Sequence, residues 1–157
     1  SKLRVAGGKS YNNFYINLAA GKNVADDLGM FAEVGLEQIL EWDPEVILLN
    51  GFEAKLSPQD IYKNELLADL SAVKNRRVYK MPLGGYRWDP PNQESPLTWL
   101  WLSMVLHPDK FDWDLADRIN NNYEFIYGQS VNADDVANIL RMDMNKDAAN
   151  YDIFAAN

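Results

Sequence analysis

Apolar and polar positions along the chain predict strands that alternate with helices. Strands are expected at residues 3–6, 46–49 and 77–81, since 46–49 is a continuous apolar run and 77–81 alternates. Helices are expected at residues 11–20, 35–42, 59–63, 64–70, 97–106, 114–127 and 133–141. Strands alternating with helices imply a parallel sheet covered on both faces, so the pattern predicts an α/β fold.

Cap residues mark several of the expected helix ends. Ser10, Asp114 and Asn132 stand where N-caps are expected, and Gly21 stands where a glycine would follow the end of a helix. After residue 141 the chain becomes polar and rich in small residues, so we expect it to fray. The sequence therefore predicts one α/β domain over residues 1–141 and a polar C-terminal tail over residues 142–157.

Composition and charge exclude several classes of function. The chain has 157 residues, a net charge of −8, no cysteine and one histidine. An acidic chain lacks the basic face that tracks nucleic-acid phosphates, so no nucleic acid is expected as a partner. Absent cysteine excludes thiol catalysis, disulfides and cysteine-based zinc sites. The D-x-N-x-D pattern at residues 143–147 lacks the glycine and glutamate that a calcium loop needs, so neither metal nor cofactor is expected.

The N-terminus and the apolar runs bear on the cell compartment. The chain starts without Met and shows no signal-peptide pattern, so we expect a mature product or an excised piece of one. No apolar run reaches the ~20 residues that span a bilayer. The longest, residues 96–106, is interrupted by Thr98 and Ser103 and is typical of a buried helix.

Five segments carry a resemblance to a known family. These segments are AGKNVA (20–25), GLEQILEWDPEVI (35–47), LSAVKNRRVY (70–79), YRWDPPNQESPL (86–97) and LWLSMVLHPD (100–109). Together they resemble the C-terminal lobe of a class III periplasmic substrate-binding protein, the receptor of an ABC importer. These receptors serve ferric siderophores, haem, cobalamin and some oxyanions. The resemblance implies a three-layer Rossmann-like lobe with a short, mostly parallel sheet flanked by helices. The family's N-terminal lobe and connecting helix have no counterpart in this chain.

The resemblance also implies a function and a place for it. The lobe would form half of a ligand cleft, most simply for an iron chelate, and dock on the transmembrane subunits of the ABC permease. It would be exported, either to the periplasm or to the cell surface on a lipid anchor, and would not be an enzyme. By resemblance, Glu94 is an exposed residue that docks on permease arginines, although a carboxylate at a helix start is favoured by the helix dipole alone.

Candidate ligand residues lie where the predicted strands end. In open α/β sheets ligands sit beyond the carboxyl ends of the strands, which are residues 7–10, 50–53 and 82–89 here. Tyr86, Arg87 and Trp88 offer two aromatic rings and a guanidinium, which suit a planar anionic ligand such as a metal chelate or an oxyanion. In the alternative, Trp88 packs over its own loop and Arg87 is solvated. A second set, Lys9, Ser10 and Tyr11, either lines the same cleft or simply starts a helix.

Two other functions stay open from the sequence. A free-standing lobe would expose Tyr86 and Trp88, and that apolar surface would favour an interaction module or a homodimer. Alternatively, Asp89 and Glu94 would form a perturbed carboxylate pair in a metal-assisted α/β enzyme.

Overall fold

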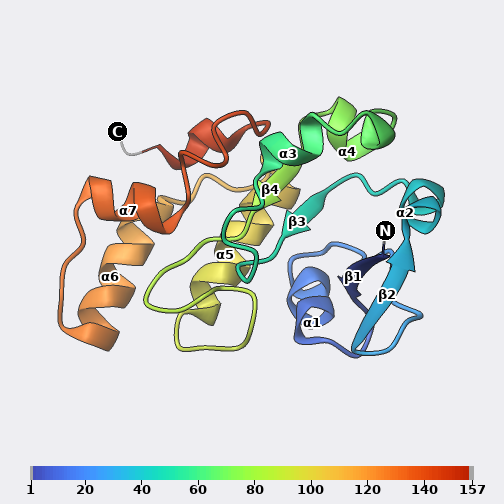
Figure 1. The fold of residues 1–157 in the computed structure, drawn as a ribbon. Coiled ribbons are helices and arrows are strands. Elements are labelled where there is room, and N and C mark those ends of the chain that lie inside the picture. The colour runs from blue at the N-terminus through green and yellow to red at the C-terminus, as the bar shows by residue number, and fades with distance from the viewer. Residues whose placement is uncertain (1, 156–157) are drawn as a thin grey trace.

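The computed structural model describes residues 2–155 and is a mixed α/β lobe (Figure 1). Its elements in chain order are β1 (Lys2–Ala6), α1 (Tyr11–Leu18), β2 (Phe31–Gly35), α2 (Leu36–Trp42), β3 (Ile47–Leu49), α3 (Pro58–Tyr62), the 3-10 helix η1 (Glu65–Leu67), α4 (Ser71–Lys74), β4 (Val78–Lys80), α5 (Ser95–Leu106), α6 (Leu115–Tyr127), α7 (Ala133–Ile139) and the 3-10 helix η2 (Tyr151–Phe154). The predicted α/β class is confirmed.

The strands form two pairs within the described residues, and only one pair is parallel. β3 and β4 run parallel, with Leu48 opposite Tyr79. β1 pairs antiparallel with β2, with Arg4 opposite Glu33. The sequence analysis predicted β1 but placed it in the parallel sheet, and it assigned no strand at Phe31–Gly35. β2 was missed because its residues are exposed or half-buried and run directly into α2, which leaves no buried apolar stretch to signal a strand.

The core is built around α5. This helix is apolar on all sides, which is typical of a helix enclosed by other elements. Trp101 and Leu102 are fully buried in it. The helix packs against α6 on one side and α1 on another. Trp101 also donates a hydrogen bond from its indole Nε1 to the Tyr151 hydroxyl at 3.1 Å, which ties the helix to η2 near the end of the chain.

The segment after α7 does not fray as far as residue 155, so that expectation is wrong over the described range. Asn145, Tyr151 and Phe154 are all buried, and Tyr151 and Phe154 pack edge to face with ring centroids 4.9 Å apart. Two aromatic side chains three residues apart bury enough apolar surface to hold an otherwise polar segment. Residues 156–157 of the predicted tail lie outside the described residues. The division into a domain and a tail at residue 141 stays a prediction.

The predicted N-caps are confirmed, whereas the predicted glycine stop is not. The side chains of Ser10, Asp114 and Asn132 each accept a hydrogen bond from the backbone N–H three residues on. The residue in the left-handed conformation after α1 is Ala20, with φ 57°, one position before Gly21. Across residues 2–155, no helix is both long and apolar enough to span a bilayer.

Candidate ligand-binding edge

The loops that follow β3 and β4 meet at one edge of the parallel pair, as the strand order predicts. Lys80, the last residue of β4, is fully buried and joins them. Its Nζ donates to the carbonyl oxygens of Asn50 at 2.7 Å and Glu53 at 2.6 Å. Burial lowers the pKa of the Lys80 ammonium, and the nearby positive charge of Arg141 lowers it further. Lys80 therefore fixes the loop after β3 against the strand that precedes the Tyr86–Arg87 loop.

Arg87 lies at this edge between an aromatic ring and a carboxylate. Its guanidinium carbon sits 3.3 Å from the ring centroid of Phe52, a side chain that is 72% exposed. Its Nη1 is 3.7 Å from Asp89 Oδ2. Asp89 is in turn anchored, because its Oδ1 accepts a hydrogen bond from the Gly51 N–H at 2.9 Å. A planar cation stacked on a ring and flanked by a charge keeps a defined orientation.

The electrostatics of Asp89 follow from its position. Burial raises the pKa of the Asp89 carboxyl, while the Gly51 N–H bond and the Arg87 charge act in the opposite direction. A Cβ at Gly51 would lie 3.2 Å from Asp89 Oδ2 and equally close to the Arg87 side chain. The backbone of Gly51 thus approaches both side chains closely because it has no side chain of its own.

The three predicted ligand residues do not share one environment. Tyr86 is 48% exposed, and Arg87 Cζ lies 5.4 Å from its ring centroid. Trp88 is completely buried, so its expected exposure to a cleft or a partner is wrong and the alternative of packing beneath the loop holds. The structure thus brings Phe52 and Asp89 to the edge in place of Trp88. The sequence-based prediction did not single out Phe52, although an aromatic residue directly after the strand-ending Asn50-Gly51 is a signal that could have indicated it.

Glu94 is also buried, which contradicts the exposed position expected of it. Its side chain has no exposed surface. Oε1 accepts hydrogen bonds from the Gly85 N–H and the Tyr127 hydroxyl, both at 2.8 Å, and Oε2 accepts one from the Trp88 indole at 2.6 Å. A docking role for Glu94 would require the carboxylate to leave these bonds. The reason sequence reasoning missed this burial is that Tyr127 lies 33 positions further along the chain.

Comparison with known proteins decides the family. The sequence profile described as "Periplasmic binding protein" matches residues 3–83. This chain belongs to the periplasmic binding protein family. It is 33% identical over 138 residues to the molybdate-binding protein MolA of Haemophilus influenzae, covering 86% of this chain and 39% of that protein. The predicted family resemblance is confirmed.

Solved structures show the same lobe in larger periplasmic binding proteins. A periplasmic solute binding protein from Veillonella parvula superimposes with a TM-score of 0.85 at 37% identity, covering 92% of this chain and 45% of that one. MolA bound to molybdate gives a TM-score of 0.73 at 32% identity, covering 83% and 40%. An ABC transporter solute binding protein from Sulfurospirillum deleyianum gives 0.76 at 25%, covering 88% and 44%. The chain spans less than half the length of these relatives.

Lys9, Ser10 and Tyr11 were expected either to line the cleft or to start a helix. The structure shows a helix start, with Ser10 as the N-cap of α1 and Tyr11 as its first residue. The Ser10 hydroxyl accepts a hydrogen bond from the Asn13 N–H at 3.1 Å, and the Tyr11 hydroxyl accepts one from the Trp99 indole at 3.2 Å. Both side chains are therefore occupied within the lobe.

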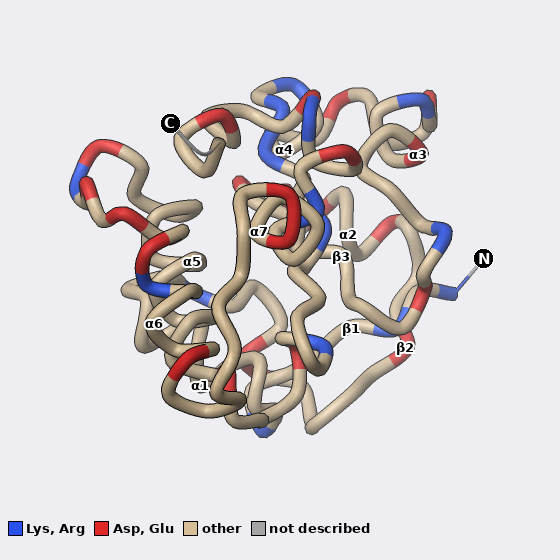
Figure 2. Tube along the Cα trace, turned by 90° about the vertical axis from the view of Figure 1, so that its left-hand side faces the viewer, with Lys and Arg blue, Asp and Glu red and all other residues tan. Residues whose placement is uncertain are grey.

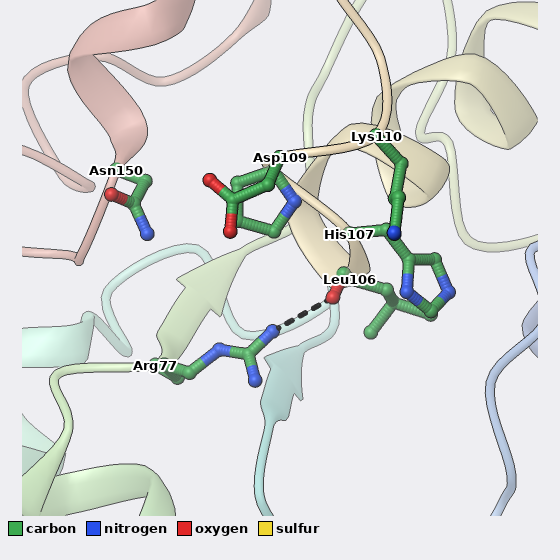
Figure 3. Close-up of a pocket in the computed structure, with 7 residues that line it drawn as sticks. Arg77, Leu106, His107, Asp109, Lys110 and Asn150 are labelled. Carbon is green, nitrogen blue, oxygen red and sulfur yellow. Dashed lines mark hydrogen bonds between the residues drawn. The ribbon is translucent and has the colours of Figure 1, made fainter.

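A hollow of about 380 Å³ lies away from the ligand edge (Figure 3). Arg77, His107, Asp109 and Lys110 line it, and Arg77 directly precedes β4, so the hollow sits at the opposite end of that strand. Arg77 Nη2 is already bonded to the carbonyl oxygens of Val105 and Leu106, each at 3.2 Å, which occupies it at the end of α5. In residues 2–155 no three His, Asp or Glu side chains gather to hold a metal ion.

Charged positions are unevenly placed over the lobe. Basic positions gather near α4, and acidic positions lie on α7 and along other segments (Figure 2).

The carboxylates Asp89 and Glu94, considered for an enzyme, are held in different hydrogen-bond networks. Asp89 is bonded to Gly51 and faces Arg87, whereas Glu94 is bonded to Gly85, Trp88 and Tyr127.

Proposed function

We propose that the chain is one lobe of an ABC-importer solute receptor and that Phe52, Tyr86 and Arg87 form its wall of a cleft for an anionic solute. The observation that carries the proposal is the oriented guanidinium of Arg87 at the carboxyl ends of β3 and β4. Ligands of open α/β sheets bind at such strand ends. Membership of the periplasmic binding protein family supports a binding role over an enzymatic one.

Arg87 has the chemistry that an anion needs. Among residues 2–155, the buried Nη1 of Arg87 has no hydrogen-bond partner, its contact with Asp89 Oδ2 is a long 3.7 Å, and 19% of the Arg87 side chain is exposed. A guanidinium donates hydrogen bonds in a planar fork that matches carboxylates and oxyanions. Phe52 and Tyr86 add exposed aromatic surface near the guanidinium. The edge therefore fits an anionic group placed beside a flat or apolar one.

Two ligand classes share this chemistry. The family resemblance favours an iron chelate, whether a siderophore, haem or cobalamin type, and an oxyanion is the second candidate. The relative MolA is named for molybdate, which supports the oxyanion. In the receptor the missing lobe would close over the ligand, the closed form would dock on the permease, and the partner ATPase would drive import. We place the receptor outside the cytoplasmic membrane, in the periplasm or on a lipid anchor.

The test is ligand binding by the 157-residue chain and its Arg87→Ala variant. Equilibrium dialysis against radioactive molybdate and against ferric citrate separates the two ligand classes, and sulfate serves as a competitor. Because a hydrogen bond to a charged group contributes about 1.5–3 kcal/mol, Arg87→Ala is expected to weaken binding roughly 10- to 100-fold. Arg118→Ala, which removes an exposed arginine from α6, is the matched control. Equal affinities for Arg87→Ala and the unvaried chain would exclude Arg87 from the site.

A further inference from the structure

Glu94 is a buried carboxylate whose bonded neighbours are uncharged donors. The Gly85 N–H, the Tyr127 hydroxyl and the Trp88 indole all point hydrogens at it. No cation pairs with it in residues 2–155. A buried carboxylate without a counter-ion is costly unless its oxygens are satisfied by hydrogen bonds and dipoles. Glu94 is the N-cap residue of the twelve-residue helix α5, so the positive end of the helix dipole also favours its charge.

The loop that carries Arg87 is fitted to this carboxylate. A Cβ at Gly84 would lie 1.9 Å from Glu94 Oε2, and a Cβ at Gly85 would lie 2.8 Å from Oε1. Both separations are shorter than a Cβ carbon tolerates, so the backbone of the turn rests directly on the carboxylate. Tyr86 and Arg87 follow immediately after these glycines. The Arg87 backbone is held by an isolated bridge to Leu83 and by a hydrogen bond from Asn92 Nδ2 to its carbonyl oxygen, and the turn between Leu83 and Arg87 rests on Glu94.

Helix α6 completes the clamp. The Tyr123 hydroxyl accepts a second, shared hydrogen bond from the Gly85 N–H at 2.9 Å. Tyr127 donates to Glu94 while accepting from the Gln93 side chain at 2.8 Å. Burial raises the pKa of Tyr123, and the negative charge of Glu94 adds to this, so the hydroxyl keeps its proton at neutral pH. These hydrogen bonds hold the Gly84–Gly85 turn between Glu94 at the start of α5 and the two tyrosines of α6.

We propose that Glu94 is a positioning residue for Arg87: with Tyr123 and Tyr127 it holds the Gly84–Gly85 turn so that the guanidinium stays aligned over Phe52. This inference rests on the proposed function, since the alignment matters for affinity only if Arg87 meets the ligand. It gives Glu94 a role inside the lobe and makes ligand affinity depend on the Tyr123 and Tyr127 hydroxyls of α6, which bond to Gly85 and Glu94 rather than to Arg87.

The chemistry of the site shows why a carboxylate is needed. Both oxygens of Glu94 accept hydrogen bonds and neither donates. In Glu94→Gln one oxygen becomes an NH2 group, which must face either the Trp88 indole N–H or the Gly85 N–H. Either orientation sets donor against donor. A glutamine of the same shape therefore opens the turn, even though it fills the same volume.

The experiment uses isotope-labelled chains and reads the turn directly by NMR. The variants are Glu94→Gln and the milder Tyr127→Phe, which deletes one hydroxyl, and Glu45→Gln at an exposed site is the control. Three quantities are measured: the amide exchange rate of Gly85, the ring-current shift that Phe52 imposes on the Arg87 side chain, and affinity for molybdate and ferric citrate. The Trp88 indole N–H resonance reports whether its bond to the carboxylate is lost.

We expect both test variants to keep the dispersed spectrum of a folded chain while Gly85 exchanges at least about fivefold faster, as loss of a buried bond implies. The Arg87 ring-current shift should shrink, and affinity should fall by a similar factor. An unchanged Arg87 shift, or a loosened Gly85 with unchanged affinity, would overturn the positioning role while leaving the proposed function intact. If the unvaried chain binds neither probe at Arg87, the proposed function fails, and the inference falls with it.

Discussion

At the scale of single residues, Asn145 takes the place of a neighbouring strand beside β4. Its side-chain Oδ1 accepts from the Lys80 N–H at 2.7 Å, and its Nδ2 donates to the Lys80 carbonyl at 3.1 Å. An amide side chain carries the same donor and acceptor as a peptide group, so it satisfies both backbone atoms of the last strand residue. Asn145 is fully buried, so water cannot replace these bonds.

Asn145→Ala is therefore expected to lower the free energy of unfolding by about 1–3 kcal/mol, because it leaves a buried N–H and a buried carbonyl without partners. Urea unfolding followed by circular dichroism measures the change. Asn121→Ala removes an exposed amide from α6 and serves as the control. Similar unfolding midpoints for the two variants would show that the Asn145 bonds add nothing to stability.

Residue-level prediction from the sequence succeeded for local chemistry and failed for burial. The caps at Ser10, Asp114 and Asn132 need only the next few residues, and the sequence predicts them correctly. Trp88 was expected to be exposed because it lies in a loop at a strand end, and Glu94 because of the family resemblance. Glu94 is bonded to Trp88 and to Tyr127 of α6, which is 33 positions away, and no local pattern shows that α6 comes to lie against the loop.

At the scale of elements, the segment between β4 and α5 is an irregular loop whose backbone is held by specific contacts. It has no ladder of its own beyond the isolated bridge between Leu83 and Arg87. Its shape comes from the contact of the Gly84–Gly85 turn with Glu94 and from the Lys80 bonds to the neighbouring loop. Loops placed by a rigid scaffold are common sites of binding, and the turn of this loop rests on a buried carboxylate at the start of α5.

Gly84→Ala tests that placement. The added methyl group would meet Glu94 Oε2 at 1.9 Å, so the turn must shift, and we expect a loss of roughly 1–3 kcal/mol in the free energy of unfolding. Gly29→Ala is the matched control, since nothing lies within 4 Å of its added methyl group. The control should change stability by no more than about 1 kcal/mol in either direction. Equal effects in thermal unfolding would refute the close approach at Gly84.

The carboxylate of Asp43 links the end of α2 to the start of α4. Asp43, which ends α2, accepts hydrogen bonds from the backbone N–H and the hydroxyl of Ser71, the first residue of α4, both at 2.7 Å. These bonds hold the pKa of the Asp43 carboxyl below its usual value. A lowered pKa means that the folded state releases this proton more readily, so the stabilisation is present above the usual aspartate pKa of about 3.9 and is lost as pH falls below it.

Asp43→Asn should accordingly unfold at lower urea than the unvaried chain at pH 7, and the difference should shrink at pH 3. The exposed Asp27→Asn is the control at both values. A difference that stays constant between pH 7 and pH 3 would mean that the charge of Asp43 makes no contribution through Ser71.

The elements that the sequence predicts well are those with a strong apolar signal. β3 follows from a continuous apolar run and α5 from a long, mostly apolar one, whereas β2 has little buried surface and gives no such signal. The pairing of β1 depends on β2 and was therefore assigned to the wrong sheet. Tyr151 and Phe154 were assigned to a frayed tail because the segment around them is polar. The burial of these two aromatic side chains holds the segment in place, and composition alone does not show that burial.

At the scale of the whole molecule, the chain has two buried apolar clusters within residues 2–155 and an exposed candidate ligand edge. α5, in the larger cluster, contacts α1, α6 and η2. The edge at Phe52 and Arg87 faces outward, with Phe52 72% exposed. The relatives it matches are more than twice as long, so the rest of such a receptor has ample length to form the opposite wall.

The central claim is that an anionic solute meets Arg87 at this edge, and chemical-shift mapping of the labelled 157-residue chain tests it most directly. Addition of molybdate, and separately of gallium citrate as the diamagnetic analogue of ferric citrate, should move the side-chain resonance of Arg87 and the amides of Gly51, Phe52 and Tyr86. The resonances of Arg77 and Lys110, which line the hollow at the opposite end of β4, should stay in place. Shifts confined to Arg77 and Lys110, or no shifts with either anion, would contradict the account.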